Sequence, residues 1–92
     1  MKKIEAEKLA KDWEKKGFSC DLWTDPPGKR WENYIHETDE LLAVAEGTLE
    51  VEISGKKKTL RSGDEVFIPA RATHSVRNIG SSTAHWYYGY KK

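Results

Sequence analysis

The sequence predicts a small all-β domain, a sandwich or jelly-roll barrel, preceded by one short helix. Short stretches in which apolar and polar residues alternate support this prediction, and turn residues separate these stretches at short intervals. The 92 residues are enough for one hydrophobic core but not for a separate substrate-binding domain. Residues 1–92 are therefore expected to form a single domain.

A helix is expected from about residue 4 to residue 16. This segment is rich in Ala, Lys and Glu, lacks Gly and Pro, and places Ile4, Leu9 and Trp13 at roughly helical spacing. Gly17 then supplies a C-terminal stop.

The barrel is expected over about residues 18–90, in seven or eight short strands. The clearest strand covers residues 48–54, where Leu49, Val51 and Ile53 alternate with polar residues. The turns are expected at DPPGK, SGKK, RSGDE and GSS. The predicted core residues from the alternating strands are Leu42, Val44, Val51, Val66, Ile68 and Val76.

The charge pattern does not favour nucleic acid as a partner. Sixteen basic and fifteen acidic residues give a net charge of +1, and the basic residues are spread along the chain. The run Lys56–Lys58 is interpreted as the solvated tip of a hairpin. No apolar run approaches the roughly 20 residues of a membrane helix, and the N-terminus lacks the apolar core of a secretion signal. A cytoplasmic protein without membrane contact is expected.

The single cysteine, Cys20, cannot form an internal disulfide, which suits a reducing compartment. It alternates with Phe18 and Leu22, and no histidine neighbours it in the sequence. We therefore interpret it as a small buried apolar residue rather than a nucleophile.

Two histidines and a glutamate beside predicted strands suggest a metal site. His36 precedes Glu40 by four positions, Glu40 opens an apolar run, and His74 lies beside another strand-like stretch. Two imidazoles and one carboxylate suit Fe(II), Mn, Ni or Zn, with positions left for water, substrate or O₂. A cation would also explain why a charge opens a buried strand. The local sequence leaves an alternative open: His36 and Glu40 could pair with each other or lie exposed at a strand end.

Two longer patterns resemble the motifs of the cupin family. The first family motif reads glycine, five residues, His-x-His, three or four residues, glutamate, six residues, glycine. Here the corresponding residues are Gly28, Tyr34, His36, Glu40 and Gly47, so every spacing fits and one ligand type differs.

The second motif reads glycine, five residues, proline, x, glycine, two residues, histidine, three residues, asparagine. It corresponds to Gly63, Pro69, Arg71, His74 and Asn78, and only Arg71, which replaces a glycine, departs from it. Eight of the ten motif positions match, which makes the resemblance specific.

The resemblance implies a small conical β-barrel and places His36, Glu40 and His74 on a metal. Tyr34 stands where the family has another histidine. Because a phenol with a pKa of about 10 is a poor neutral ligand, Tyr34 is expected to act as acid, base or orienting group, or to fill the cavity. The missing imidazole should weaken metal binding.

The other aromatic and histidine side chains are expected to be mainly structural. His85 has no place in either motif and is expected on the surface or on a strand face. Trp23, Trp31 and the aromatics of the last strand are expected in core or dimer contacts, with a wall of the ligand cavity as the alternative. These last-strand aromatics are Trp86, Tyr87, Tyr88 and Tyr90.

Together these features predict a small metal-binding protein that holds a small organic molecule in its barrel. Oxygenase, isomerase and lyase reactions are the chemistries such a site would allow. The alternative is a non-catalytic module that binds or senses a ligand or a metal. A homodimer is expected because a small barrel leaves open sheet edges and surplus aromatics.

Overall fold

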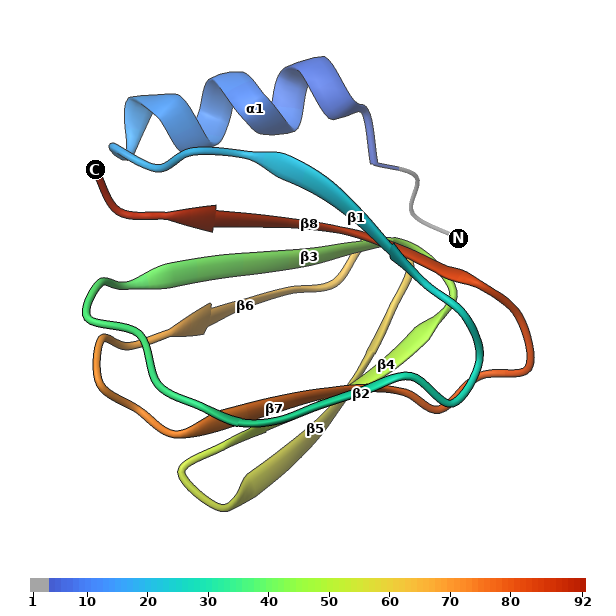
Figure 1. Cartoon of the computed structure of the whole chain (residues 1–92). Coiled ribbons are helices and arrows are strands. Elements are labelled where there is room, and N and C mark those ends of the chain that lie inside the picture. Colours follow the sequence, from blue (N-terminus) through green and yellow to red (C-terminus); the bar gives the residue numbers. More distant parts are fainter. Residues whose placement is uncertain (1–3) are drawn as a thin grey trace.

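The computed structural model describes residues 4–92 and contains one helix followed by eight strands (Figure 1). The helix, α1, spans Ala6–Lys15. The strands are β1 Asp21–Asp25, β2 Arg30–Tyr34, β3 Glu40–Glu46, β4 Thr48–Ile53, β5 Lys56–Arg61, β6 Glu65–Ile68, β7 His74–Asn78 and β8 Ala84–Tyr90. The predicted all-β class with a short N-terminal helix is confirmed.

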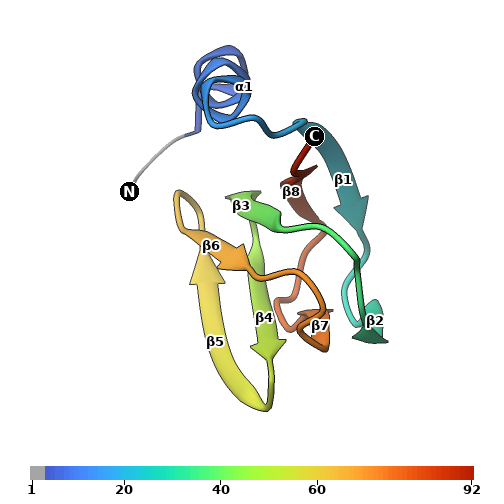
Figure 2. The ribbon, with the colours of Figure 1, turned by 90° about the vertical axis from the view of Figure 1, so that its left-hand side faces the viewer.

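The eight strands form two antiparallel sheets of four strands each. The strand order is β1-β8-β3-β6 in the first sheet and β2-β7-β4-β5 in the second. The two sheets face each other, and α1 lies across the outer side of the first sheet (Figures 1 and 2). Side chains that point inward from both sheets therefore meet in one interior.

The main core lies between the two sheets. The predicted core residues that are buried there, each with at most 5% of its surface exposed, are Leu42, Val44, Val51, Ile68 and Val76. Val66 is only partly buried and packs against this cluster, so its prediction as a core residue is corrected. It lies in β6, a four-residue edge strand with a neighbour on one side only.

Strand β3 is buried on both faces. Leu42 and Val44 belong to the core between the sheets, whereas Leu41 and Ala43 pack against Trp13 beneath α1. Full burial of a large apolar side chain contributes about 1.5–3 kcal/mol, so α1 is an integral part of the domain.

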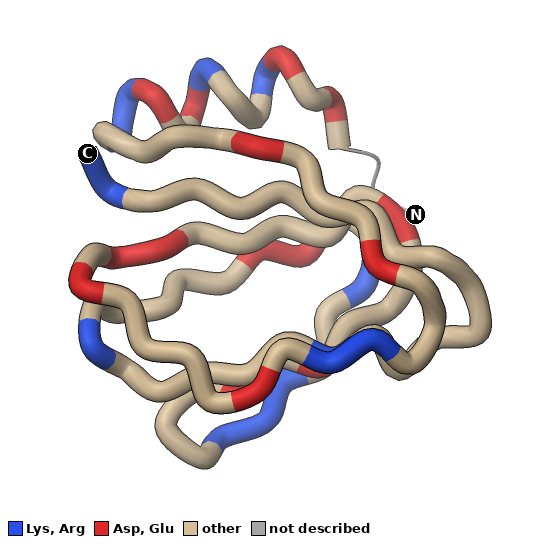
Figure 3. The backbone as a smooth tube through the Cα atoms, viewed as in Figure 1, with Lys and Arg blue, Asp and Glu red and all other residues tan. Residues whose placement is uncertain are grey.

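Acidic and basic residues are interspersed along the chain (Figure 3). Lys56–Lys58 are exposed at the start of edge strand β5, one step beyond the hairpin turn at Ser54 and Gly55, rather than at its tip. No helix among residues 4–92 is long and apolar enough to cross a membrane.

Candidate metal centre

The three predicted metal ligands come from two strand ends and one loop. Glu40 is the first residue of β3 and His74 the first residue of β7. His36 lies in the loop after β2, which ends at Tyr34. The β2–β7 register is irregular just before Tyr34, and Asn33 has a φ of 57°, which explains why the ladder stops early.

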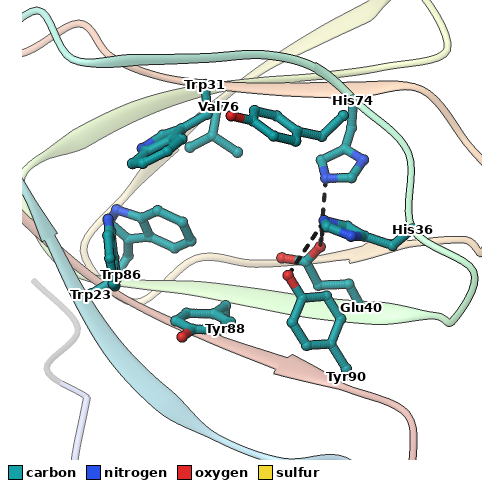
Figure 4. A pocket seen from close by; sticks show the side chains of 10 residues that line it. Trp23, Trp31, His36, Glu40, His74, Val76, Trp86, Tyr88 and Tyr90 are labelled. Carbon is teal, nitrogen blue, oxygen red and sulfur yellow. Dashed lines mark hydrogen bonds and ion pairs between the residues drawn. The ribbon is translucent and has the colours of Figure 1, made fainter.

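These three side chains converge in one pocket between the sheets (Figure 4). The Oε1 atom of Glu40 lies 3.6 Å from Nε2 of His36 and 3.5 Å from Nε2 of His74. One ligand atom from each residue lies within 4.8 Å of the other two. Ligand atoms about 2.0–2.2 Å from one ion would be about 3.0–3.5 Å apart, so small side-chain movements suffice and the donor set fits a divalent transition metal.

Glu40 is a buried carboxylate whose charge the described side chains do not neutralise with hydrogen bonds. Its side chain is almost fully buried, and its Oε1 atom has no hydrogen-bond partner among the described residues. Burial raises the pKa of Glu40 to about 7. Distances of 3.5 and 3.6 Å to the imidazoles are too long for good hydrogen bonds. Simple pairing between His36 and Glu40 therefore accounts poorly for this carboxylate, whereas a shared cation would neutralise it.

The hydrogen bonds of the imidazoles leave nitrogen atoms directed toward Glu40. Nδ1 of His74 lies 3.2 Å from the carbonyl oxygen of Ala72. Because a carbonyl can only accept, Nδ1 carries the proton, and Nε2 keeps the lone pair that a metal requires. Burial and the neighbouring His74 lower the pKa of His36, which favours its neutral, ligand-competent form.

Two short contacts hold the loop that carries His36. The backbone N–H of Arg71 donates to the His36 carbonyl over 2.7 Å, and that of Ala70 donates to Oδ1 of Asp39 over 2.8 Å. Arg71, which replaces the motif glycine, has a left-handed φ of 67°. The turn after β6 thus fixes the ligand loop at the expense of some backbone strain.

Tyr90 contributes a phenol to the site. Its hydroxyl lies 3.3 Å from Nε2 of His36, although the two residues are 54 positions apart in the sequence. Burial, with the Glu40 and Tyr88 side chains, raises the pKa of Tyr90 to about 12, so this group stays protonated near neutral pH. Tyr34, the predicted catalytic residue, lines the pocket but is 43% exposed, and its ring stacks on that of His36 with centroids 6.4 Å apart.

The pocket extends from the metal ligands to an aromatic end (Figure 4). Its volume is about 240 Å³. The walls beyond the ligands and the two tyrosines are formed by Trp23, Trp31, Val76, Trp86 and Tyr88. The aromatic side chains of Trp23, Trp31 and the last strand therefore form a wall of the cavity, as the alternative expected. Tyr87 is the exception and packs beneath α1. Trp86 lines the pocket and also belongs to the main core.

A buried carboxylate that the sequence did not reveal, Asp25, holds the three tryptophans of this end. Its Oδ1 accepts a hydrogen bond from Nε1 of Trp23 at 3.0 Å. Its Oδ2 accepts from Nε1 of Trp31 at 3.0 Å and from Nε1 of Trp86 at 3.1 Å. In the sequence Asp25 stands directly before two prolines, a position that indicates only a turn.

His85 lies away from the pocket, as expected, and Cys20 is also outside the pocket. His85 is 3.3 Å from the exposed carboxylate of Glu46. Cys20 is partly buried and packs against the cluster beneath α1, and burial raises the pKa of its thiol, which favours the unreactive protonated form.

A family model described as a cupin domain matches residues 21–90. Among curated proteins, the chain is similar to polyketide synthase CurC from Streptomyces cyaneus, with 36% identity over 59 residues. That match covers 63% of this chain and 38% of CurC, so the chain spans well under half of this relative's length.

Solved structures give the same fold. The cupin domain of an XRE family transcriptional regulator from Enterobacter cloacae is 28% identical, with a TM-score of 0.75 and 87% of each chain covered. Oxalate oxidase in complex with the substrate analogue glycolate is 25% identical, with a TM-score of 0.75, 83% of this chain covered and 42% of the oxidase chain. With the family model matching most of its length and its barrel shared with these structures, the chain belongs to the cupin family.

Proposed function

We propose that this protein is a metal-dependent cupin that binds a small organic molecule in its barrel and transforms it. His36, Glu40 and His74 would hold one divalent ion of Fe, Mn, Ni or Zn. The observation that carries the proposal is the buried Oε1 atom of Glu40, which has no hydrogen-bond partner among residues 4–92 and faces two imidazole nitrogens. A cation at this point would satisfy all three groups.

A metal held there would supply Lewis acidity or a binding position for O₂, which is the basis of the proposed oxygenase, isomerase or lyase chemistry. The chain's own groups bind and orient the ligand around it. The hydroxyl of Tyr90 keeps its proton and can donate it in a hydrogen bond to a ligand oxygen. Tyr34, on a more exposed part of the wall, is the proposed acid, base or orienting group. The tryptophans exclude water from the far side.

The names of two similar proteins support a small, oxygen-containing ligand. The oxalate oxidase structure contains glycolate, a small hydroxy acid, as a substrate analogue of that enzyme. The curated relative is named as a polyketide synthase. Both names belong to longer proteins, so the substrate and the reaction of this chain are part of the proposal.

The metal half of the proposal is tested by thermal unfolding of metal-stripped protein after addition of Fe(II), Mn(II), Ni(II) or Zn(II). At a hundred times its dissociation constant a metal should stabilise the fold by about 2.7 kcal/mol. His74→Ala should abolish the rise, and His85→Ala, which changes a histidine outside the pocket, should retain it. Tyr34→His, which restores the family's usual ligand type, should increase it. If none of the four metals shifts unfolding at millimolar concentration, the proposal is wrong.

The catalytic half is tested with metal-loaded protein and a panel of small diketones, phenols and thiols. Oxygen consumption and product formation should occur with at least one class and should be lost in His74→Ala. Binding without turnover of any compound would contradict an enzymatic role.

The alternative is a non-catalytic module that senses a ligand or a metal. It is favoured by the similar cupin domain from Enterobacter cloacae, which is part of a transcriptional regulator and matches this chain over 87% of its own length. Such a module should bind its ligand and leave it unchanged.

We propose a cytoplasmic location, supported by the single, partly buried cysteine. We also propose a homodimer, supported by the open edges of both sheets. Most of the aromatic side chains line the pocket and are therefore not available for a dimer interface. Light scattering at tens of micromolar protein, with a dimer mass expected, tests this proposal.

A further inference from the structure

We propose that the tryptophan end of the pocket is a subsite for a planar aromatic group of one or two rings. This ring subsite consists of Trp23, Trp31, Trp86 and Tyr88, and Asp25 is its positioning residue. The ring would carry the oxygen atoms that reach the metal ligands at the other end of the pocket. The inference thus names a substrate class for the proposed function and depends on that function only through the metal-binding oxygens.

The tryptophan walls of the ring subsite offer no free hydrogen-bond donor. An indole has a single polar group, its Nε1–H, and Asp25 accepts the hydrogen bond from each of the three tryptophans. Only the carbon faces and edges of these rings remain for a ligand. A polar group placed against them would lose its hydrogen bonds to water without replacement, so these walls select an apolar group.

The arrangement of the walls favours a flat ring over an aliphatic chain. The rings of Trp23 and Trp31 meet at 69° with centroids 6.0 Å apart, and those of Trp23 and Tyr88 at 79° with centroids 6.4 Å apart. These are edge-to-face contacts, which form corners rather than a flat wall. An aromatic ring in such a corner can present its face to one wall and its edge to another, and both contacts are favourable.

The size of the pocket limits the ligand to one or two rings. Its volume of about 240 Å³ is below the roughly 300–1,000 Å³ of sites for drug-sized ligands. It exceeds the roughly 150 Å³ of an apolar cavity that accepts benzene. The same pocket is also lined by His36, Glu40 and His74, so a ligand whose ring lies in the ring subsite can direct a pair of oxygens toward these side chains (Figure 4).

Asp25 makes the ring subsite rigid before any ligand arrives. Its three partners come from β1, β2 and β8, which belong to both sheets, so one carboxylate fixes walls on both sides of the interior. Side chains that are already fixed lose little conformational freedom on binding. Asp25 therefore acts on affinity through the tryptophans and does not contact the ligand.

The test uses zinc-loaded protein and three hydroxamates that share one metal-binding group: acetohydroxamate, cyclohexanecarbohydroxamate and benzohydroxamate. Isothermal titration calorimetry should show benzohydroxamate binding about tenfold more tightly than acetohydroxamate, because the phenyl ring buries additional apolar surface. It should also bind more tightly than the cyclohexyl compound, which is similar in size but not flat. Equal or tighter binding of the cyclohexyl compound would overturn the selection for a planar ring.

Variants test whether the preference for benzohydroxamate arises in the ring subsite. Trp23→Leu changes a partly exposed wall and should reduce the preference for benzohydroxamate to about threefold or less, with affinities for zinc and acetohydroxamate unchanged. Asp25→Asn should produce the same loss, provided that circular dichroism shows a folded protein. Leu22→Ala, an exposed residue of the same strand outside the pocket, should retain the full preference. A full preference in Trp23→Leu would contradict the assignment.

A measurement on metal-free protein separates failure of this inference from failure of the proposed function. Phenol should shift the indole N–H resonances of Trp23, Trp31 and Trp86 in NMR spectra, whereas Trp13, the buried tryptophan of α1 and outside the pocket, serves as an internal control. Such shifts in a protein that binds no zinc would support the ring subsite and refute only the metal. No shift with phenol, or a larger shift with tetramethylammonium, would refute the ring subsite, and the latter would indicate a cation-binding cage.

Discussion

Two buried carboxylates, Asp25 and Glu40, belong to opposite ends of the same pocket, and they differ in how the chain satisfies their oxygen atoms with hydrogen bonds. Asp25 is 2% exposed and accepts three indole N–H bonds. Glu40 is 4% exposed, and its Oε1 atom has no hydrogen-bond partner among the described residues. A charge that supports the fold is compensated by side chains of the chain itself. The charge that is proposed to bind a metal ion has no such compensation from the chain.

The largest expected effect is the loss of Asp25. Asp25→Ala should lower the free energy of unfolding by about 3–5 kcal/mol, because it removes the acceptor of three indole N–H groups from a largely buried position. Urea denaturation of metal-free protein measures this change. Asp21→Ala, an exposed aspartate in the same strand, should have almost no effect. Equal stabilities for the two variants would show that the indole bonds do not support the fold.

Loss of the charge at Glu40 should raise the free energy of unfolding, whereas loss of Asp25 should lower it. The pKa of Glu40 is raised from 4.5 to about 7 in the folded protein. Its protonation therefore stabilises the fold below about pH 4.5, and this contribution is lost as the pH rises through 7. At pH 8 the ionised carboxylate should lower the free energy of unfolding by roughly 3 kcal/mol. Glu40→Gln should then be more stable than wild type by about 2–3 kcal/mol in the presence of EDTA.

At pH 5 the difference between Glu40→Gln and wild type should fall below about 1 kcal/mol. The lowered pKa of His36 has the opposite pH dependence, with stability lost as the pH falls below the unfolded value of 6.5 toward the lowered pKa, but it is present in both proteins and largely cancels. Glu46→Gln, at an exposed carboxylate, is the control and should match wild type at both pH values. A less stable Glu40→Gln at pH 8 would mean that Glu40 is compensated within the chain, as Asp25 is.

A smaller effect is expected for the phenol beside His36. The Tyr90 hydroxyl and a metal compete for Nε2 of His36, so Tyr90→Phe should tighten zinc binding by about two- to tenfold. Competition titration with a chelating dye measures this change. Tyr87→Phe, which alters a tyrosine beneath α1, should leave the affinity unchanged. Weaker zinc binding in Tyr90→Phe would show that the phenol supports the metal ligand.

The smallest effect concerns the turn that holds the His36 loop. Arg71 has a φ of 67°, which a glycine adopts without strain. Arg71→Gly should be about 1 kcal/mol more stable than Arg71→Ala, which removes the same exposed side chain but keeps the strained backbone. Thermal unfolding of both variants is the measurement. Equal stabilities would show that the turn relaxes without help from glycine.

The spacing of residues along the chain was sufficient to predict that His36, Glu40 and His74 converge. Short turns fix where His36, Glu40 and His74 lie relative to one another. Such turns can be predicted because they favour Gly, Pro, Asn, Asp and Ser. The exact end of β2 was not predictable, because the irregular pairing near Asn33 depends on the partner strand.

The tryptophan end depends on contacts between distant segments. Asp25 and Trp86, for example, are separated by 61 positions. In the last strand, alternation separates Trp86, Tyr88 and Tyr90 from Tyr87, but both faces are apolar. The pattern therefore does not indicate which face lines the pocket and which lies beneath the helix.

Because β3 is buried on both faces, its register depends on the residues at its two ends. Residues 41–44 are apolar on both faces, so a shift of the strand by one position would exchange the two sets with little change in hydrophobicity. The residues at its ends prevent the shift: Glu40 would turn toward the helix, and at Gly47 any Cβ atom would come within 2.9 Å of the Ala84 backbone. Position 40 is therefore expected to need a polar residue whether or not a metal binds there, since that residue also sets the register of the strand.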